Sequence, residues 1–106
     1  FIASAPVVLV VAADMKEIEM RYGERGKGLY AIQDTAAAIE NILLAAWDRG
    51  LGACWVGAFS ERDVANILAL PSYIRPVAII PIGAPAEAPR KPKRKGIKEV
   101  IHWEHW

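Results

Sequence analysis

The chain has 106 residues, of which 54% are hydrophobic, and it carries thirteen Lys and Arg against twelve Asp and Glu. This length and composition exclude an intrinsically disordered chain and allow one domain with its own apolar core. The single cysteine, Cys54, excludes an internal disulfide and suits a reducing compartment, so we expect a cytoplasmic protein.

The first predicted element is a strand over residues 6–12, a continuous β-branched run without alternation. Such a run indicates a strand that is buried on both faces and central in its sheet. No basic region precedes it, so a signal peptide is not expected. The pattern starts close to Phe1 without a turn or cap, and the chain therefore looks N-terminally truncated. Residues 15–28 are polar, contain three glycines and predict a mobile loop with room for a short helical turn.

A long helix is predicted over residues 29–49, because apolar side chains recur there at helical spacing: Ile32, Ala36, Ile39, Leu43 and Ala46. Gly50 follows the last of them and can adopt the left-handed conformation that ends a helix, with Leu51 placed for the accompanying apolar contact. Ile42 and Leu44 lie off this apolar stripe. The helix thus has more apolar surface than the chain can cover, and we expect a second subunit to cover it.

The second half of the chain predicts a short strand over residues 53–56, a helix that begins after Ser60, and a strand over residues 77–82. The Ser60 hydroxyl can cap the first turn of that helix, and Pro71 stops it. Pro81 cannot donate to a strand ladder, which implies a sheet edge, a bulge or a strand end. The order of elements fits an α+β layered domain, and a long helix between two strands favours a crossover connection.

Residues 83–96 predict an extended arm with concentrated positive charge. Between residues 90 and 98 there are six cations and no acid, namely Arg90, Lys91, Lys93, Arg94, Lys95 and Lys98. The remainder has seven cations against twelve acids, a net charge of −5. The arm suits a phosphate site built on an arginine fork, a contact with a nucleic-acid backbone, or a solvated loop. The acidic body lacks the broad positive face of nucleic-acid binders, so we expect no nucleic-acid partner.

The tail over residues 97–106 contains two tryptophans, which we expect to anchor it to a partner or to the same domain. His102 and His105 would point to opposite faces of an extended tail, so no metal site is predicted. Cys54 is expected to be a buried strand residue, because its sequence neighbours are apolar.

Small residues gather where the second strand meets the second helix, in the run Gly50-Leu51-Gly52-Ala53-Cys54-Trp55-Val56-Gly57-Ala58-Phe59. Small side chains let a ligand approach the backbone, and amides at such a junction can donate hydrogen bonds to an electron-rich ring. A purely structural interpretation, in which the glycines end a helix and form a turn, stays open.

Four motifs in this order resemble the C-terminal part of the nitroreductase family: Arg21-Tyr22-Gly23, the run from Ile32 to Ala46, the run from Gly50 to Phe59, and Pro81-Ile82-Gly83-Ala84-Pro85 with the basic arm. These are flavin-dependent oxidoreductases that bind FMN at a dimer interface. The resemblance implies an α+β fold with a layered sheet, helices on both faces, and the long helix at the centre of a homodimer. Residues 1–106 would form a single domain, the C-terminal portion of a nitroreductase-like domain, with the tail across the partner.

The resemblance also implies cofactor-binding residues. The segment that would lie along the isoalloxazine ring of FMN consists of Trp55, Val56, Gly57 and Ala58. The amides of Gly57 and Ala58 would face N5 and O4 of the ring. Arg94 best matches the residue that holds the FMN phosphate, and Lys93 and Lys91 are weaker matches. No side chain is identified as a catalytic acid or base, and no residue as a metal ligand.

The implied activity transfers a hydride from NAD(P)H through FMN to a nitroaromatic, a quinone or a similar acceptor, in two half-reactions. The apolar opening is too short to span a bilayer, so no membrane partner is expected. The family's N-terminal half, with an arginine-rich phosphate-binding helix and a polar flavin contact, has no counterpart here, so the chain looks like roughly half of a flavin site. The competing hypothesis is a non-catalytic dimerisation or binding module, or a fragment that lacks a complete flavin site.

Overall fold

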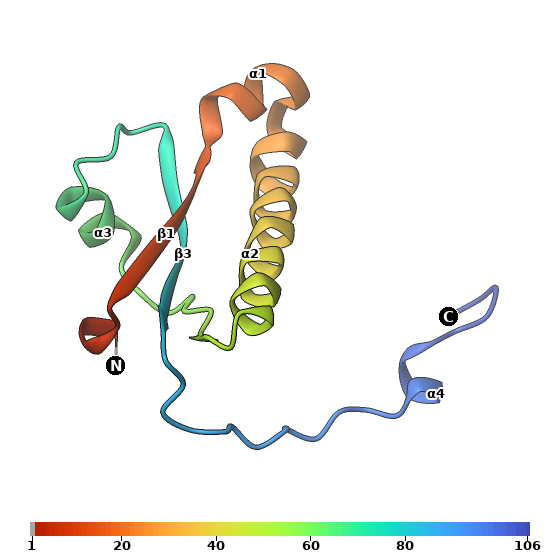
Figure 1. Cartoon of the computed structure of the whole chain (residues 1–106). Coiled ribbons are helices and arrows are strands. Elements are labelled where there is room, and N and C mark those ends of the chain that lie inside the picture. The colour runs from red at the N-terminus through yellow and green to blue at the C-terminus, as the bar shows by residue number, and fades with distance from the viewer. Residues whose placement is uncertain (1) are drawn as a thin grey trace.

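The computed structural model describes residues 2–106, and at its centre is a three-stranded antiparallel sheet in the order β1-β3-β2 (Figure 1). The strands are β1 (Val7–Asp14), β2 (Gly52–Ala53) and β3 (Ile74–Gly83). Both β1 and β2 pair antiparallel with β3, so they run in the same direction on either side of it. The chain therefore crosses over between them, as the sequence predicted.

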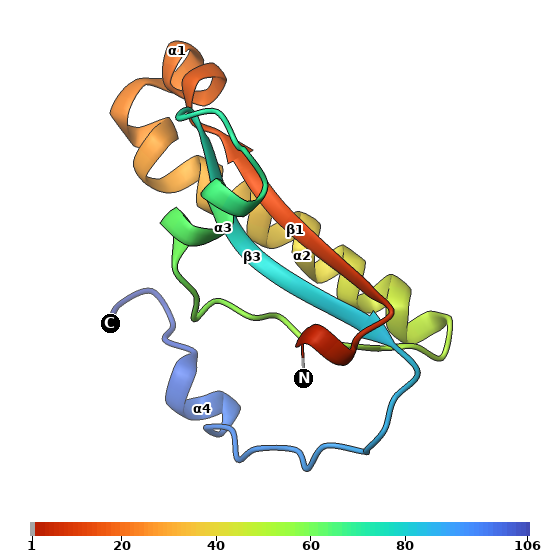
Figure 2. The same cartoon turned by 90° about the vertical axis from the view of Figure 1, so that its left-hand side faces the viewer.

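The helices are α1 (Met15–Arg25), α2 (Ala31–Asp48), α3 (Glu61–Ile67) and α4 (Ile97–Val100), with a 3-10 turn η1 (Ile2–Ser4) and a π-helical turn η2 (Gly26–Tyr30). The two views show α2 on one face of the sheet and α3 on the opposite face (Figures 1 and 2). This arrangement confirms the α+β prediction with helices on both faces.

The core lies between α2 and the middle of the sheet. Ile39 of α2 is 1% exposed and packs with Ala78 and Ile80 of β3, which are fully buried. Partly buried apolar side chains surround this cluster, namely Val11, Ile42, Leu43 and Ile82. The predicted helical stripe is therefore the face of α2 that packs on the sheet, and the predicted helix bounds are correct to within two residues.

Gly50 ends α2 in the predicted way. Its φ of +69° lies in the left-handed region, where a side chain would be strained. The Gly50 amide donates to the Trp47 carbonyl at 2.9 Å, and the Leu51 amide donates to the Ala46 carbonyl at 2.9 Å. These two bonds form a Schellman motif, which satisfies carbonyls at the end of the helix.

The prediction that the first strand is central and buried on both faces is wrong. β1 is an edge strand, and its first half is solvent-exposed, with Val7 at 52%. Among the described residues, no further strand pairs with its outer edge. A β-branched run predicts a strand that can be buried on both faces. Whether the strand is central or at an edge depends on which other elements surround it.

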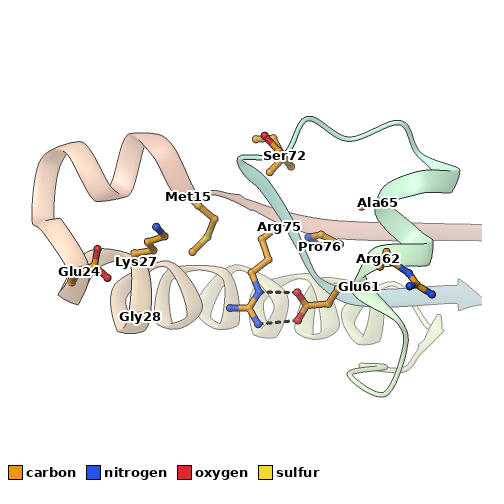
Figure 3. Close-up of a pocket in the computed structure, with 11 residues that line it drawn as sticks. Met15, Glu24, Lys27, Gly28, Glu61, Arg62, Ala65, Ser72, Arg75 and Pro76 are labelled. Atoms are coloured by element: carbon orange, nitrogen blue, oxygen red, sulfur yellow. Dashed lines mark hydrogen bonds and ion pairs between the residues drawn. The ribbon is translucent and has the colours of Figure 1, made fainter.

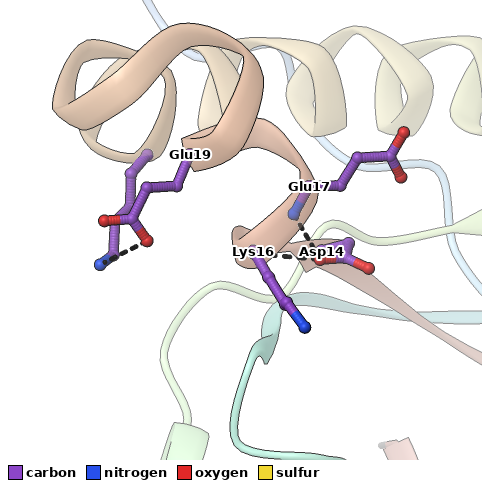
Figure 4. Close-up of polar contacts among 5 residues, drawn as sticks. Asp14, Lys16, Glu17 and Glu19 are labelled. Carbon is purple, nitrogen blue, oxygen red and sulfur yellow. Dashed lines mark hydrogen bonds and ion pairs between the residues drawn. The ribbon is translucent and has the colours of Figure 1, made fainter.

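The predicted mobile loop over residues 15–28 is also wrong, because α1 and η2 occupy it. The Asp14 carboxylate caps α1 by accepting from the amides of Lys16 at 3.0 Å and Glu17 at 2.9 Å (Figure 4). An Asp followed three residues later by Glu is a helix-start pattern that periodicity alone overlooks. Gly23, with φ +60°, kinks the helix. The Lys27 ammonium then pairs with Glu19 at 3.1 Å.

The strand predicted over residues 77–82 forms as the centre of β3, which contains two prolines. Pro81 lies two residues before the end of β3, which agrees with the expected strand end. Its carbonyl accepts from the Cys54 amide at 3.4 Å, so its backbone faces β2 and the ladder with β1 is undisturbed. Pro76 lies where the register of β1 shifts between Val11 and Ala12, a position where a missing donor is tolerated.

The basic arm leaves the body after Gly83 and carries no regular structure until α4 (Figure 1). The radius of gyration is 16.8 Å. A compact domain of this length would have about 13 Å. The difference confirms the extended arm that the proline-rich sequence predicted.

Replacing Ile39 by Ala should destabilise the fold by about 2–4 kcal/mol, because it leaves a cavity against Ala78 and Ile80. Urea unfolding followed by circular dichroism measures the change. The matched control is Ile67→Ala, since Ile67 is 81% exposed and should change stability by less than about 0.5 kcal/mol. Equal effects of the two substitutions would show that the core lies elsewhere.

Candidate functional site

The predicted flavin-facing segment, residues 55–58, runs along the edge of β3 between β2 and α3. Val56 pairs with Ile79 by two backbone hydrogen bonds, one donated by each residue, at 2.9 and 3.0 Å. Four residues later Ser60 is the N-cap of α3, and its hydroxyl accepts from the Asp63 amide at 3.2 Å. The structure therefore confirms the helix cap, and residues 57–59 bridge a sheet edge and a helix start.

Gly57 and Ala58 are both exposed residues. Within residues 2–106, neither amide donates a hydrogen bond to the chain. A Cβ built on Gly57 would meet no atom within 4 Å. Trp55, two residues before Gly57, is 42% exposed. Accessible donors next to an aromatic side chain fit a flat, electron-rich heterocycle such as a flavin ring.

Cys54 is exposed, so the prediction of a buried strand residue is wrong. Its amide donates to the carbonyl of Pro81, which keeps this stretch beside β3. β2 is only two residues long and forms the outer edge of the sheet. Because this edge strand is so short, the Cys54 side chain stays accessible although its neighbours in sequence are apolar.

The structure does not bring Lys93 and Arg94 beside residues 55–58. Both lie on the exposed arm, which leads away from the sheet (Figures 1 and 2). Neither forms an ion pair or a hydrogen bond with the part of the chain that the structure describes. The two halves of the predicted cofactor site are thus separate within one chain, and the roles of these residues stay predictions.

A cleft of about 580 Å³ lies between α1, α3 and the start of β3 (Figure 3). Across it, the Arg75 guanidinium donates two parallel hydrogen bonds to the Glu61 carboxylate, from Nε at 2.9 Å and from Nη2 at 2.8 Å. These bonds lower the pKa of Glu61 and raise that of Arg75. Fourteen residues separate the partners, so no local sequence pattern indicated this contact.

Sequence reasoning therefore missed this ion pair, which joins the first residue of α3 to the central strand. A second ion pair, between Lys27 and Glu19, lies within α1 and η2 and raises the pKa of Lys27. Glu24 and Arg62 also line the cleft. The cleft is lined by both positive and negative side chains, so its electrostatic potential does not favour a ligand of one charge sign.

In the tail, the His102 ring stacks on Trp106 with centroids 4.2 Å apart. In the described chain, no group of three or more His, Cys, Asp and Glu side chains is arranged to hold a metal ion. Across the same residues, no helix has the length and apolar character needed to cross a membrane.

Comparison with known proteins gives a consistent result. A sequence model of the nitroreductase family matches residues 1–84. A protein of Methanothermobacter thermautotrophicus, provisionally named NADH dehydrogenase/NAD(P)H nitroreductase, is 32% identical over 99% of this chain and 53% of its own length. A Bacillus subtilis protein named FMN reductase (NADPH) is 33% identical over 70% of this chain and 30% of its own length.

Solved structures have the same fold. A nitroreductase family protein from Streptococcus pneumoniae TIGR4 superposes with a TM-score of 0.85 at 20% identity, over 96% of this chain and 66% of that one. The NfrA1 protein of B. megaterium superposes with a TM-score of 0.80 at 30% identity, over 97% of this chain and 47% of that one. The chain spans about half the length of the relative from Methanothermobacter thermautotrophicus.

Proposed function

This chain belongs to the nitroreductase family, and on that premise we propose that it forms the ring-binding part of an FMN-dependent oxidoreductase. The proposed reaction takes a hydride from NAD(P)H and passes electrons to a nitroaromatic, a quinone or a similar acceptor. The relative from Bacillus subtilis that is named FMN reductase (NADPH) supports FMN as the cofactor. The names of relatives that mention NAD(P)H support the nicotinamide donor.

The observation that carries the proposal is the pair of accessible amides at Gly57 and Ala58 beside Trp55. The Val56–Ile79 bridge keeps these amides next to a rigid strand, so they can donate to a heterocycle without reorganising. The half-exposed Trp55 ring supplies an apolar surface beside them. FMN, when bound, supplies the hydride-transfer chemistry, and the protein supplies orientation and hydrogen bonds.

Replacing Ala58 by Pro should weaken FMN binding by about ten-fold, because proline removes one amide donor. The quenching of FMN fluorescence on titration with protein measures the affinity. Ala58→Gly keeps the amide and is the matched control, with an affinity close to that of the unmodified protein. A colourless protein that takes up no added FMN would contradict the proposal and favour the alternative, a non-catalytic dimerisation or binding module.

The phosphate of the cofactor is the proposed ligand of Arg94, whose planar fork can hold it with two parallel hydrogen bonds. Since Arg94 is exposed on the arm, it reaches a ring at residues 55–58 only if the arm packs against the body of its own chain or of a second copy. Lys93 would add a point charge beside it.

Arg94→Ala should therefore weaken FMN binding by about ten-fold or more, while Lys98→Ala should leave it nearly unchanged. The same fluorescence titration, repeated with riboflavin in place of FMN, isolates the contribution of the phosphate. Riboflavin affinity should not respond to Arg94→Ala. Equal losses from both substitutions would indicate that general positive charge, and not a phosphate contact, attracts the cofactor.

A homodimer is proposed because the chain leaves too much apolar surface uncovered. Its accessible area is 8619 Å². A compact monomer of this mass would expose roughly 5,800 Å². The excess of about 2,800 Å² per chain includes the surface of the extended arm, and it is large enough to supply one partner's share of an obligate interface. Large apolar side chains contribute to it on α2 and in the tail: Leu44, Trp47, Trp103 and Trp106.

Light scattering should give twice the chain mass of 11.6 kDa. Trp47→Glu should shift the protein toward monomer, because Trp47 is 80% exposed on α2 and a charge there would be buried at the interface. Ile67→Glu, on the opposite face of the sheet, is the control and should keep the dimer. An unmodified protein that is monomeric at all concentrations would refute the assembly.

A further inference from the structure

Residues 57–60 form the loop between Val56 and α3. The end of this loop at Val56 is attached to the central strand. Val56 exchanges two backbone hydrogen bonds with Ile79 of β3, at 2.9 and 3.0 Å. β3 is the strand that lies between the other two and carries the buried side chains Ala78 and Ile80. The loop is therefore attached at this end to the central, buried strand of the sheet.

The other end of the loop, at the start of α3, is attached to β3 through side chains. Glu61, the first residue of α3, receives two parallel hydrogen bonds from Arg75 of β3 (Figure 3). Paired bonds between a guanidinium and a carboxylate fix orientation as well as distance. Glu61 follows Ser60 directly, so the ion pair locates the place where the loop enters the helix.

Apolar packing alone holds α3 weakly. The helix has seven residues, none of which is buried, and its last residue, Ile67, is 81% exposed. Leu68, at its C-terminal cap, is also exposed. A helix with so little buried surface depends more than most on a specific contact for its position. The bidentate pair supplies such a contact at the end nearest the loop.

The two attachments limit how far the loop can move. Arg75 and Ile79 lie on the same strand, so the two attachment points are held at a fixed separation along β3. Only residues 57–60 lie between Val56 and Glu61. A loop this short, held at both ends, has fewer conformations available than one held at a single end.

We propose that Glu61 and Arg75 are positioning residues, whose ion pair holds the amides of Gly57 and Ala58 in the orientation that binds the cofactor ring. The role in cofactor binding rests on the proposed function, whereas the restraint on the loop does not. Without the pair, the loop spends part of its time in other conformations. The apparent affinity for FMN then falls in proportion to the fraction of molecules whose loop is in the binding conformation.

The test compares Glu61→Gln with Glu19→Gln. Glu19 forms a similar ion pair with Lys27, and the side chains of these two pairs are 42–47% exposed. Hydrogen exchange of the chain without FMN gives protection factors for the amides of Asp63 and Val64, which donate to the hydroxyl and the carbonyl of Ser60 at the end of the loop. Glu61→Gln should lower them about three- to five-fold, the scale of a half-exposed ion pair. FMN affinity should fall by a similar factor, and Glu19→Gln should change neither quantity.

A pH series distinguishes the ion pair from mere loss of a side chain. Because Arg75 lowers the pKa of Glu61 below its ordinary value of 4.5, the restraint is present at neutral pH and is lost as pH falls through that lowered pKa. Arg62, Lys27 and Glu24 also face this cleft, and Glu61→Gln leaves all three in place. The protection difference between unmodified protein and Glu61→Gln should therefore disappear at low pH.

Several outcomes would overturn the proposal. One is unchanged protection of the Asp63 and Val64 amides in Glu61→Gln, and another is an equal loss of protection at Ile39 and Ile80, which would mean global destabilisation. Arg75→Gln must reproduce the local effect. Failure of the unmodified chain to bind FMN would refute the proposed function, while the exchange measurements would still decide whether the ion pair restrains the loop.

Discussion

The packing of Ile39 from α2 against Ala78 and Ile80 of β3 is the contact on which the rest of the structure depends. It places the long helix across the sheet and makes β3 the central strand, with β1 and β2 on its two sides. Because only a few side chains are fully buried, this small cluster supplies much of the cooperative stability of the chain.

β3 also organises the candidate site. One of its edges pairs with β1 through an eight-residue ladder, and the other is nearly free, since β2 contributes only two residues. Residues 52–56 lie along that second edge and lead into the exposed residues Gly57 and Ala58. A rigid strand beside an exposed loop is a common way to present a binding segment with little conformational cost.

The proposed dimer depends on the apolar surface that one chain leaves exposed. α2 buries one stripe on the sheet and leaves Leu44 and Trp47 exposed, while the basic arm and the tail with its two tryptophans extend away from the body. A cofactor at residues 55–58 would meet the arm cations only if the arm packed against the body of its own chain or of a second copy. In a homodimer, the packing that covers the apolar surface would also complete the site, so dimerisation and cofactor binding would be coupled.

The sequence by itself determined the local features. The spacing from Ile32 to Ala46, the glycine at 50 and the cap at Ser60 depend on residues close in the chain, and all three are confirmed. Only the tertiary structure decided that β1 is an edge strand, that Cys54 is exposed and that Arg75 meets Glu61. These depend on which surfaces meet after folding, because burial and long-range pairing are properties of neighbours in space and not of neighbours in sequence.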